Sequence, residues 1–161
     1  EIKMDISILR LEEKLPEWRI VPIFEEVIPK TSDFLGSPLL ILFFSLGCSG
    51  CLGRAIPFAN RVVYEKGNSI KVIGIHTNFE GVDFSIGQFQ IAKEQYVIRF
   101  PFFKDFNFDT TFLDYGAGGT PHWILVDANG IVKYSIFGSD PNNALLRLDY
   151  KIDELINFQP I

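Results

Sequence analysis

The sequence has few cysteines, and their scarcity excludes several kinds of structure. Its 161 residues contain two cysteines, one methionine and two tryptophans. Two cysteines cannot form the framework of a disulfide-rich scaffold, and they fall short of the four ligands of a structural zinc site. The two histidines, His76 and His122, are far from them in sequence. We therefore expect neither a metal nor any other resident cofactor.

Long apolar runs and excess positive charge are also absent. The chain has 20 acidic and 15 basic residues, a net charge of −5 and no basic stripe, so nucleic acid is not an expected partner. No apolar run approaches the roughly 20 residues of a membrane-spanning helix, and no secretion signal is evident. The chain begins with Glu-Ile-Lys rather than Met, so a signal or anchor upstream could have been removed.

What is present favours a well-packed core. Apolar residues make up 47% of the chain and include 16 phenylalanines. This length and composition predict one domain over residues 1–161, with an N-terminal extension over 1–37 and a core over 38–157. In the extension we expect a weak edge strand over residues 5–11 and one or two helical turns over residues 23–27.

The most informative stretch is residues 38–51. Leu39–Phe44 is continuously apolar, which predicts a strand buried on both faces. Small and polar residues follow, and apolar positions then recur at helical spacing, predicting a helix over residues 49–66 that is bent by Pro57. Cys48 and Cys51 therefore lie where the strand meets the helix.

This position suits redox chemistry. Unpaired backbone N–H groups and the helix dipole stabilise a thiolate at a helix N-terminus, and the thiolate is the form that attacks disulfides. The two-residue spacing lets Cys51 reach back to Cys48 and close a disulfide. Arg54, on the next turn, could favour the thiolate, although a solvated surface charge explains it as well. The pair predicts a dithiol redox centre.

The remaining elements alternate between strands and helices. A second strand over residues 70–76 should run parallel to the first, because a helix connects them. It would bring His76 to the edge of the site, where a hydrogen-bonded structural histidine is the simpler interpretation. Glu80 is a second candidate for that edge.

Further along the chain, several shorter elements are expected. The first is a helix from Asp83 or Ser85 to about Val97, with Ile86, Phe89, Ala92 and Tyr96 facing inward. A strand over 100–103, a helix over 108–115 and a glycine-rich turn over 116–119 follow it. The Asn129-Gly130 turn predicts a hairpin over 122–137. A last helix should begin at Asp140, with Pro141 in its first turn.

This order of elements resembles the thioredoxin fold, and more narrowly the TlpA-like branch of the AhpC/TSA group. The resemblance covers residues 36–157 and is carried by segments 48–51, 73–77 and 119–130, the second of which is also similar to DipZ-type thioredoxin-like domains. The helix and strand over 83–103 match the insertion of that branch. The resemblance implies a three-layer α/β/α sandwich and a thiol-disulfide oxidoreductase.

The resemblance also implies roles for four residues. Cys48 would be the attacking thiol and Cys51 the resolving one. Pro121 would follow a cis peptide bond facing the pair, and the backbone of Thr120 would receive an extended substrate. The relatives imply protein thiol or disulfide substrates, an upstream electron donor, and action as a reductant in the periplasm or another extracytoplasmic space.

Three positions depart from the family pattern. Gly47 replaces the usual aromatic residue before the first cysteine, Leu42 stands where many thioredoxins have a buried acid, and Pro57 lies one residue late. Without that acid, the proton of Cys51 must pass to a water or to a more distant group such as Glu80.

Three alternatives remain open from the sequence. A thiol peroxidase of the same superfamily would need a Pro and a Thr or Ser before the reactive cysteine, and Ser45-Leu46-Gly47 offers no such set. A copper-delivery module could use the two cysteines for Cu(I), but no methionine-rich or histidine-rich neighbourhood supports it. A scaffold with an idle redox pair is the third.

Overall fold

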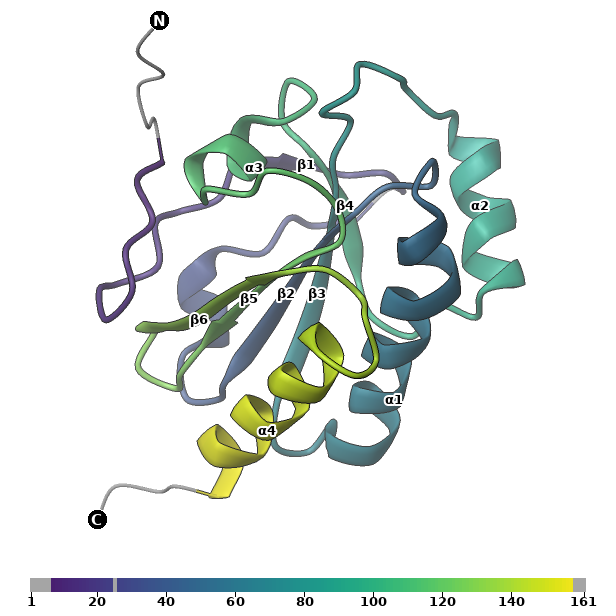
Figure 1. Cartoon of the computed structure of the whole chain (residues 1–161). Helices are drawn as coiled ribbons and strands as arrows, with labels where there is room; N and C mark the ends of the chain where they lie inside the picture. The colour runs from purple at the N-terminus through teal and green to yellow at the C-terminus, as the bar shows by residue number, and fades with distance from the viewer. Residues whose placement is uncertain (1–6, 25, 158–161) are drawn as a thin grey trace, which may run out of the picture.

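The protein is built around one mixed β-sheet. We describe a computed structural model, which covers residues 7–24 and 26–157, and within these residues the sheet has six strands in the order β1-β4-β3-β2-β5-β6 (Figure 1). The strands are β1 Ile20–Val21, β2 Leu39–Phe44, β3 Lys71–His76, β4 Phe102–Asp105, β5 His122–Val126 and β6 Val132–Phe137. Strands β2, β3 and β4 are parallel, and the other three pair antiparallel with their neighbours.

Helices cover both faces of this sheet. They are η1 Thr31–Phe34, the π-helix η2 Cys51–Ala55, α1 Ile56–Lys66, α2 Ile86–Gln95, α3 Thr110–Asp114 and α4 Ala144–Asn157. Helices α1, α2 and α4 lie on one face, and α3 lies on the other together with the N-terminal segment (Figure 1). None of the helices in the described residues is long and apolar enough to cross a membrane.

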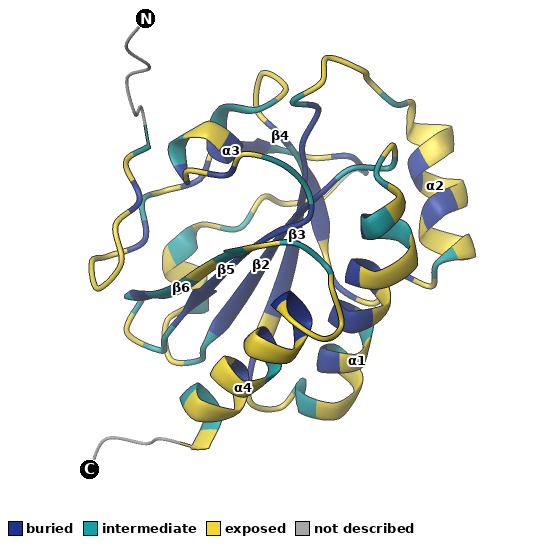
Figure 2. Ribbon diagram, viewed as in Figure 1, coloured by how far each residue is buried: buried dark blue, intermediate teal, exposed yellow. Residues whose placement is uncertain are grey.

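Strand β2 is the centre of the core. All six of its side chains are at most 2% exposed, which confirms the prediction of a strand buried on both faces (Figure 2). Leu40, Leu42 and Phe44 pack against α1, α2 and α4, whereas alternate residues pack against α3 and the N-terminal segment. The sheet is thus enclosed between two helical layers, as the three-layer prediction requires.

The N-terminal segment differs from expectation. Residues 7–11 form no strand, and residues 5 and 6 lie outside the described residues. Residues 23, 24, 26 and 27 form no helix, because Pro22 and Pro29 leave too short a stretch between them, and residue 25 is not described. Instead, β1 extends the sheet by pairing with β4. The division into an extension and a core stays a prediction.

The helix at the cysteines includes a π-helical turn. The chain is helical without a break over residues 49–66: residues 49 and 50 are α-helical, Cys51–Ala55 form a π-helical turn, and Ile56–Lys66 form α1. Pro57 therefore lies inside this helical run, as the sequence predicted, directly after the π-helical turn. Wide π-helical turns are common at functional sites, and this one carries the second cysteine.

Other boundaries agree closely or shift by a few residues. Ser85 begins α2 by accepting the N–H of Gln88, but Ile86 is 65% exposed instead of facing inward. The Asp140 carboxylate accepts the N–H of Asn142 in a separate turn, so α4 begins only at Ala144. The predicted hairpin is present as β5 and β6.

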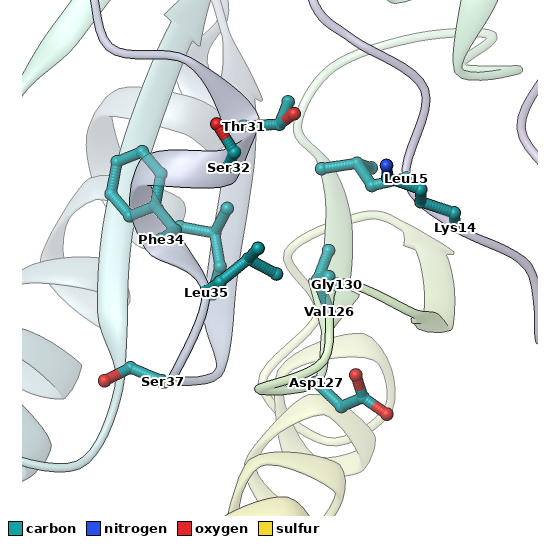
Figure 3. A pocket seen from close by; sticks show the side chains of 11 residues that line it. Lys14, Leu15, Thr31, Ser32, Phe34, Leu35, Ser37, Val126, Asp127 and Gly130 are labelled. Carbon is teal, nitrogen blue, oxygen red and sulfur yellow. The ribbon is translucent and has the colours of Figure 1, made fainter.

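At the end of the sheet away from the cysteines, η1 packs against the β5–β6 turn. Figure 3 shows a small, mainly apolar cavity there, with Phe34 and Leu35 on one side and Val126 and Gly130 on the other. Its volume of about 30 Å³ leaves room between η1 and the turn for about one or two waters.

Gly74 provides a test of the packing on β3. A Cβ at this position would lie 2.8 Å from the Phe100 ring and 3.0 Å from both Phe102 Cβ and the Phe44 ring. We expect Gly74→Ala to lower the free energy of unfolding by about 1–3 kcal/mol in urea titrations. Gly118→Ala, where a Cβ meets nothing within 4 Å, is the matched control. Equal stability of the two variants would contradict this account.

Candidate active site: a dithiol in an open groove

The two cysteines lie at the C-terminal end of β2, and both are free thiols. Cys48 is partly exposed, whereas Cys51 is fully buried. The N–H of Cys51 donates to Cys48 Sγ at 3.2 Å, and the Cys48 carbonyl accepts the N–H groups of Cys51 and Leu52, each at 3.1 Å. The turn thus places one sulfur at the surface and the other beneath it.

This arrangement separates the acidities of the two thiols. Hydrogen bonding with the Cys51 thiol lowers the pKa of Cys48 to about 6, helped by Thr120 and by the backbone N–H groups of Cys51 and Gly50, although burial opposes the shift. The same hydrogen bond, together with burial, raises the pKa of Cys51. At neutral pH the outer sulfur is therefore mainly a thiolate and the inner one keeps its proton.

The loop before β5 faces the cysteines. The Thr120–Pro121 peptide bond is cis, and the Thr120 carbonyl oxygen lies 3.5 Å from Cys48 Sγ. Pro121 is buried, and its carbonyl accepts the N–H of Gly138 at 2.8 Å. Because β5 pairs directly with β2, the sheet brings residues separated by about seventy positions in sequence to one site.

His76 anchors the loop that leads into Cys48. Its Nε2 accepts the N–H of Leu46 at 3.0 Å, and its ring is enclosed edge-on by Phe44, Phe84 and Phe89. Burial, reinforced by the charge of Lys104, lowers the pKa of His76 to about 3. The ring is therefore neutral, which agrees with the structural interpretation and not with a role as a proton carrier.

The other candidates lie at different places. His122 is buried, with its Nε2 2.8 Å from Ser135 Oγ, and burial lowers the pKa of His122 to about 4. Leu42 is fully buried in the core, so no acid stands at that position. Arg54 is exposed on the π-helical turn. Glu80 is exposed and lines the same groove as Cys48.

The groove has walls that sequence reasoning missed. It is open, has a volume of about 520 Å³ and includes Cys48 in its lining. Residues 119–121 and 137–139 also line it, together with Phe79 and Glu80. Phe137 could have been found from the hairpin register, because it pairs with His122, which directly follows Pro121. Phe79 carries no comparable signal.

Comparison with solved structures identifies the fold. No protein-family profile and no curated protein matches the sequence. A thiol-disulfide isomerase from Corynebacterium glutamicum is 22% identical with a TM-score of 0.79, and the match covers 92% of this chain and 98% of that one. A thioredoxin-like superfamily protein is 26% identical, also with a TM-score of 0.79, with coverage of 92% and 99%.

An exposed lipoprotein thioredoxin from Streptococcus pneumoniae is also similar. It is 18% identical with a TM-score of 0.69, and the match covers 87% of this chain and all of the other. These likenesses extend over nearly the whole of both chains. The chain therefore has a thioredoxin-like fold, as the resemblance in its sequence predicted.

The acidity of Cys48 can be measured directly. We expect the rate of alkylation by iodoacetamide to rise with pH around a midpoint of about 6, with Cys48 as the modified residue. Cys51→Ala should raise this midpoint, because it removes the largest stabilising contribution to the thiolate. Ser49→Ala is the matched control, since Ser49 is exposed and does not contribute to the shift. An unchanged midpoint in Cys51→Ala would refute the proton-sharing account.

The buried state of His76 predicts a pH-dependent stability. The pKa of His76 falls from 6.5 to about 3 on folding, so between these values the unfolded chain binds a proton that the folded protein does not. Stability from this residue is present above pH 6.5 and is lost on acidification, at up to about 1.4 kcal/mol per pH unit.

His76→Gln tests this contribution, because its side-chain oxygen can still accept the Leu46 N–H. Urea titrations between pH 4 and 7 should show the native protein losing stability relative to the variant as the pH falls below 6.5. Asp105 acts in the opposite direction in both proteins, because burial raises its pKa to about 6. Parallel curves for the two proteins would show that His76 does not titrate on unfolding.

Proposed function

We propose that the protein is an enzyme that exchanges its Cys48–Cys51 dithiol with disulfides of other proteins. The observation that carries this proposal is the difference in burial and acidity between the two sulfurs. One is partly exposed with a pKa of about 6, and the other is buried directly beneath it and protonated. A stable nucleophile with an attached proton donor is what disulfide exchange requires.

The reaction begins at Cys48. Its thiolate attacks one sulfur of the substrate disulfide, the S–S bond breaks, and the other substrate sulfur leaves as a thiolate that takes up a proton. Cys51 then loses its proton and attacks Cys48 Sγ, which releases the second substrate thiol and leaves a Cys48–Cys51 disulfide. The substrate gains two electrons and two protons. The enzyme supplies both electrons and the proton of Cys51, and the second proton comes from the solvent.

The same hydrogen bond controls the timing of the second step. While Cys48 is a thiolate, it holds the proton of Cys51 and raises the pKa of Cys51. Once Cys48 is bound in the mixed disulfide, its sulfur carries no charge and no longer raises the pKa of Cys51. The proton can then pass to water in the open groove or to Glu80, which lines it.

We assign substrate positioning to Thr120 and Pro121. The Thr120 carbonyl faces Cys48 Sγ at 3.5 Å, and the backbone there lies at the edge of the groove. An extended substrate segment could pair with such an edge through main-chain hydrogen bonds. This arrangement would align the substrate sulfur with Cys48.

We further propose that the protein acts as a reductant outside the cytoplasm, in the periplasm or an equivalent space. The similarity to an exposed lipoprotein thioredoxin supports this location. A reductant becomes oxidised in each cycle, so an upstream electron donor must restore the dithiol. The TlpA-like, AhpC/TSA-type features of the sequence support the same assignment.

The proposal predicts different outcomes for the two cysteines. Cys48→Ser should abolish reduction of insulin disulfides, because no nucleophile remains at the surface. Cys51→Ser should trap mixed disulfides, visible as covalent adducts on a non-reducing gel that disappear with added thiol. Both variants should keep native stability in urea, which separates lost chemistry from lost folding.

Full insulin-reducing activity in Cys48→Ser would rule the mechanism out. Two further assays address the alternatives. Peroxide consumption faster than that of free thiol would favour a peroxidase, and a stoichiometric Cu(I) complex would favour metal delivery.

A further inference from the structure

The groove at the cysteines adjoins a second compartment. This side compartment has a volume of about 240 Å³ and adds Thr77, Asn78, Val82 and Phe84 to the lining. It shares Ser45, Gly47, Phe79 and Glu80 with the groove that contains Cys48. The side compartment therefore lies directly beside the groove, within reach of a ligand segment that lies over Cys48.

Gly47 lines both compartments and has no side chain to occupy either. A Cβ at residue 47 would lie 3.7 Å from the Phe84 ring, so a larger side chain there would project toward the side compartment. Residue 47 is where this sequence lacks the aromatic residue that its relatives usually carry before the first cysteine. With no side chain at residue 47, no group from that position stands between the two compartments.

The side compartment has a firm apolar wall. Phe79 stacks on Phe112 with ring centroids 4.9 Å apart, and Phe84 packs edge-on against His76 at 5.3 Å. Val82 is 57% exposed at the rim. Since the two aromatic rings are held from behind, an apolar side chain could be covered here without rearrangement of the wall.

The charge at this surface comes from Glu80. It lines both compartments, it is exposed, and it forms no ion pair within the residues that the structure describes. The neighbouring acid, Asp83, is already paired with Lys104 at 2.9 Å. The surface therefore combines an apolar wall with one unpaired carboxylate, next to a reactive sulfur.

We infer that the preferred substrate is an extended protein segment in which the reacting cysteine is flanked, within a few residues, by an apolar side chain and by a Lys or Arg. The apolar side chain enters the side compartment and the cation pairs with Glu80. This inference rests on the proposed disulfide exchange and names its substrate class. The adjacency of the two compartments and the unpaired charge of Glu80 support it.

Single-turnover kinetics with short synthetic peptides test this preference. Each peptide carries one cysteine as a mixed disulfide with thionitrobenzoate, so attack by reduced protein releases a coloured thiolate. Four peptides combine leucine or serine on one side of the cysteine with lysine or glutamate on the other. We expect the leucine–lysine peptide to react about tenfold faster than the serine–glutamate peptide, the combined effect of partial apolar burial and one exposed ion pair.

Three variants test whether Glu80 and the side compartment cause the preference. Glu80→Lys should reverse the choice between lysine and glutamate, while Glu65→Lys, the same charge change at an exposed position on α1, should leave it intact. Gly47→Phe should remove the preference for leucine, because the added ring would project into the side compartment. Val82→Ser repeats that test at an exposed rim position, in case Gly47→Phe fails to fold.

Hydroxyethyl disulfide, which is small and uncharged, distinguishes failure of the substrate preference from failure of disulfide exchange. If it and all four peptides react at similar rates, the substrate preference is overturned while disulfide exchange stands. A preference that survives Glu80→Lys and Val82→Ser also overturns the inference. If neither hydroxyethyl disulfide nor any of the peptides reacts, the proposed function falls, and the inference falls with it.

Discussion

The hydrogen bond between the two sulfurs is the interaction on which the site depends. It lowers the pKa of Cys48 and raises that of Cys51, and burial of only the second sulfur widens the difference. The low dielectric around Cys51 makes its charged form costly, so the proton stays with the inner sulfur until the outer one is bonded. In the proposed exchange, this one contact would provide both a stable nucleophile and a delayed second nucleophile.

The rest of the fold holds that contact in place. Strand β2 is buried on both faces and ends directly before the loop to Cys48, which His76 anchors through Leu46. Strand β5 lies beside β2 and brings Thr120 to the outer sulfur. A fully packed sheet resists small displacements, so the rigid core provides the positional accuracy that the exposed loops lack by themselves.

The elements with a strong pattern were predicted well, and those without one were not. The continuous apolar run of β2, the Asn129-Gly130 hairpin and the helical spacing of α1 each carry a local signal, and each is present. The N-terminal segment is held by distant contacts, such as the pairing of Ile20 with Asp105, which leave no periodicity in the sequence. Its strand and helix predictions were therefore wrong.

The sequence by itself determined the chemistry and its local setting. Two cysteines at this spacing, between an apolar strand and a helix, can be recognised because they are neighbours in the chain. Only the tertiary structure decided the acidity of each sulfur, the anchoring role of His76 and the walls formed by Phe79 and Phe137. Burial and hydrogen bonding across the sheet set these properties, and both depend on residues that are distant in sequence and adjacent only after folding.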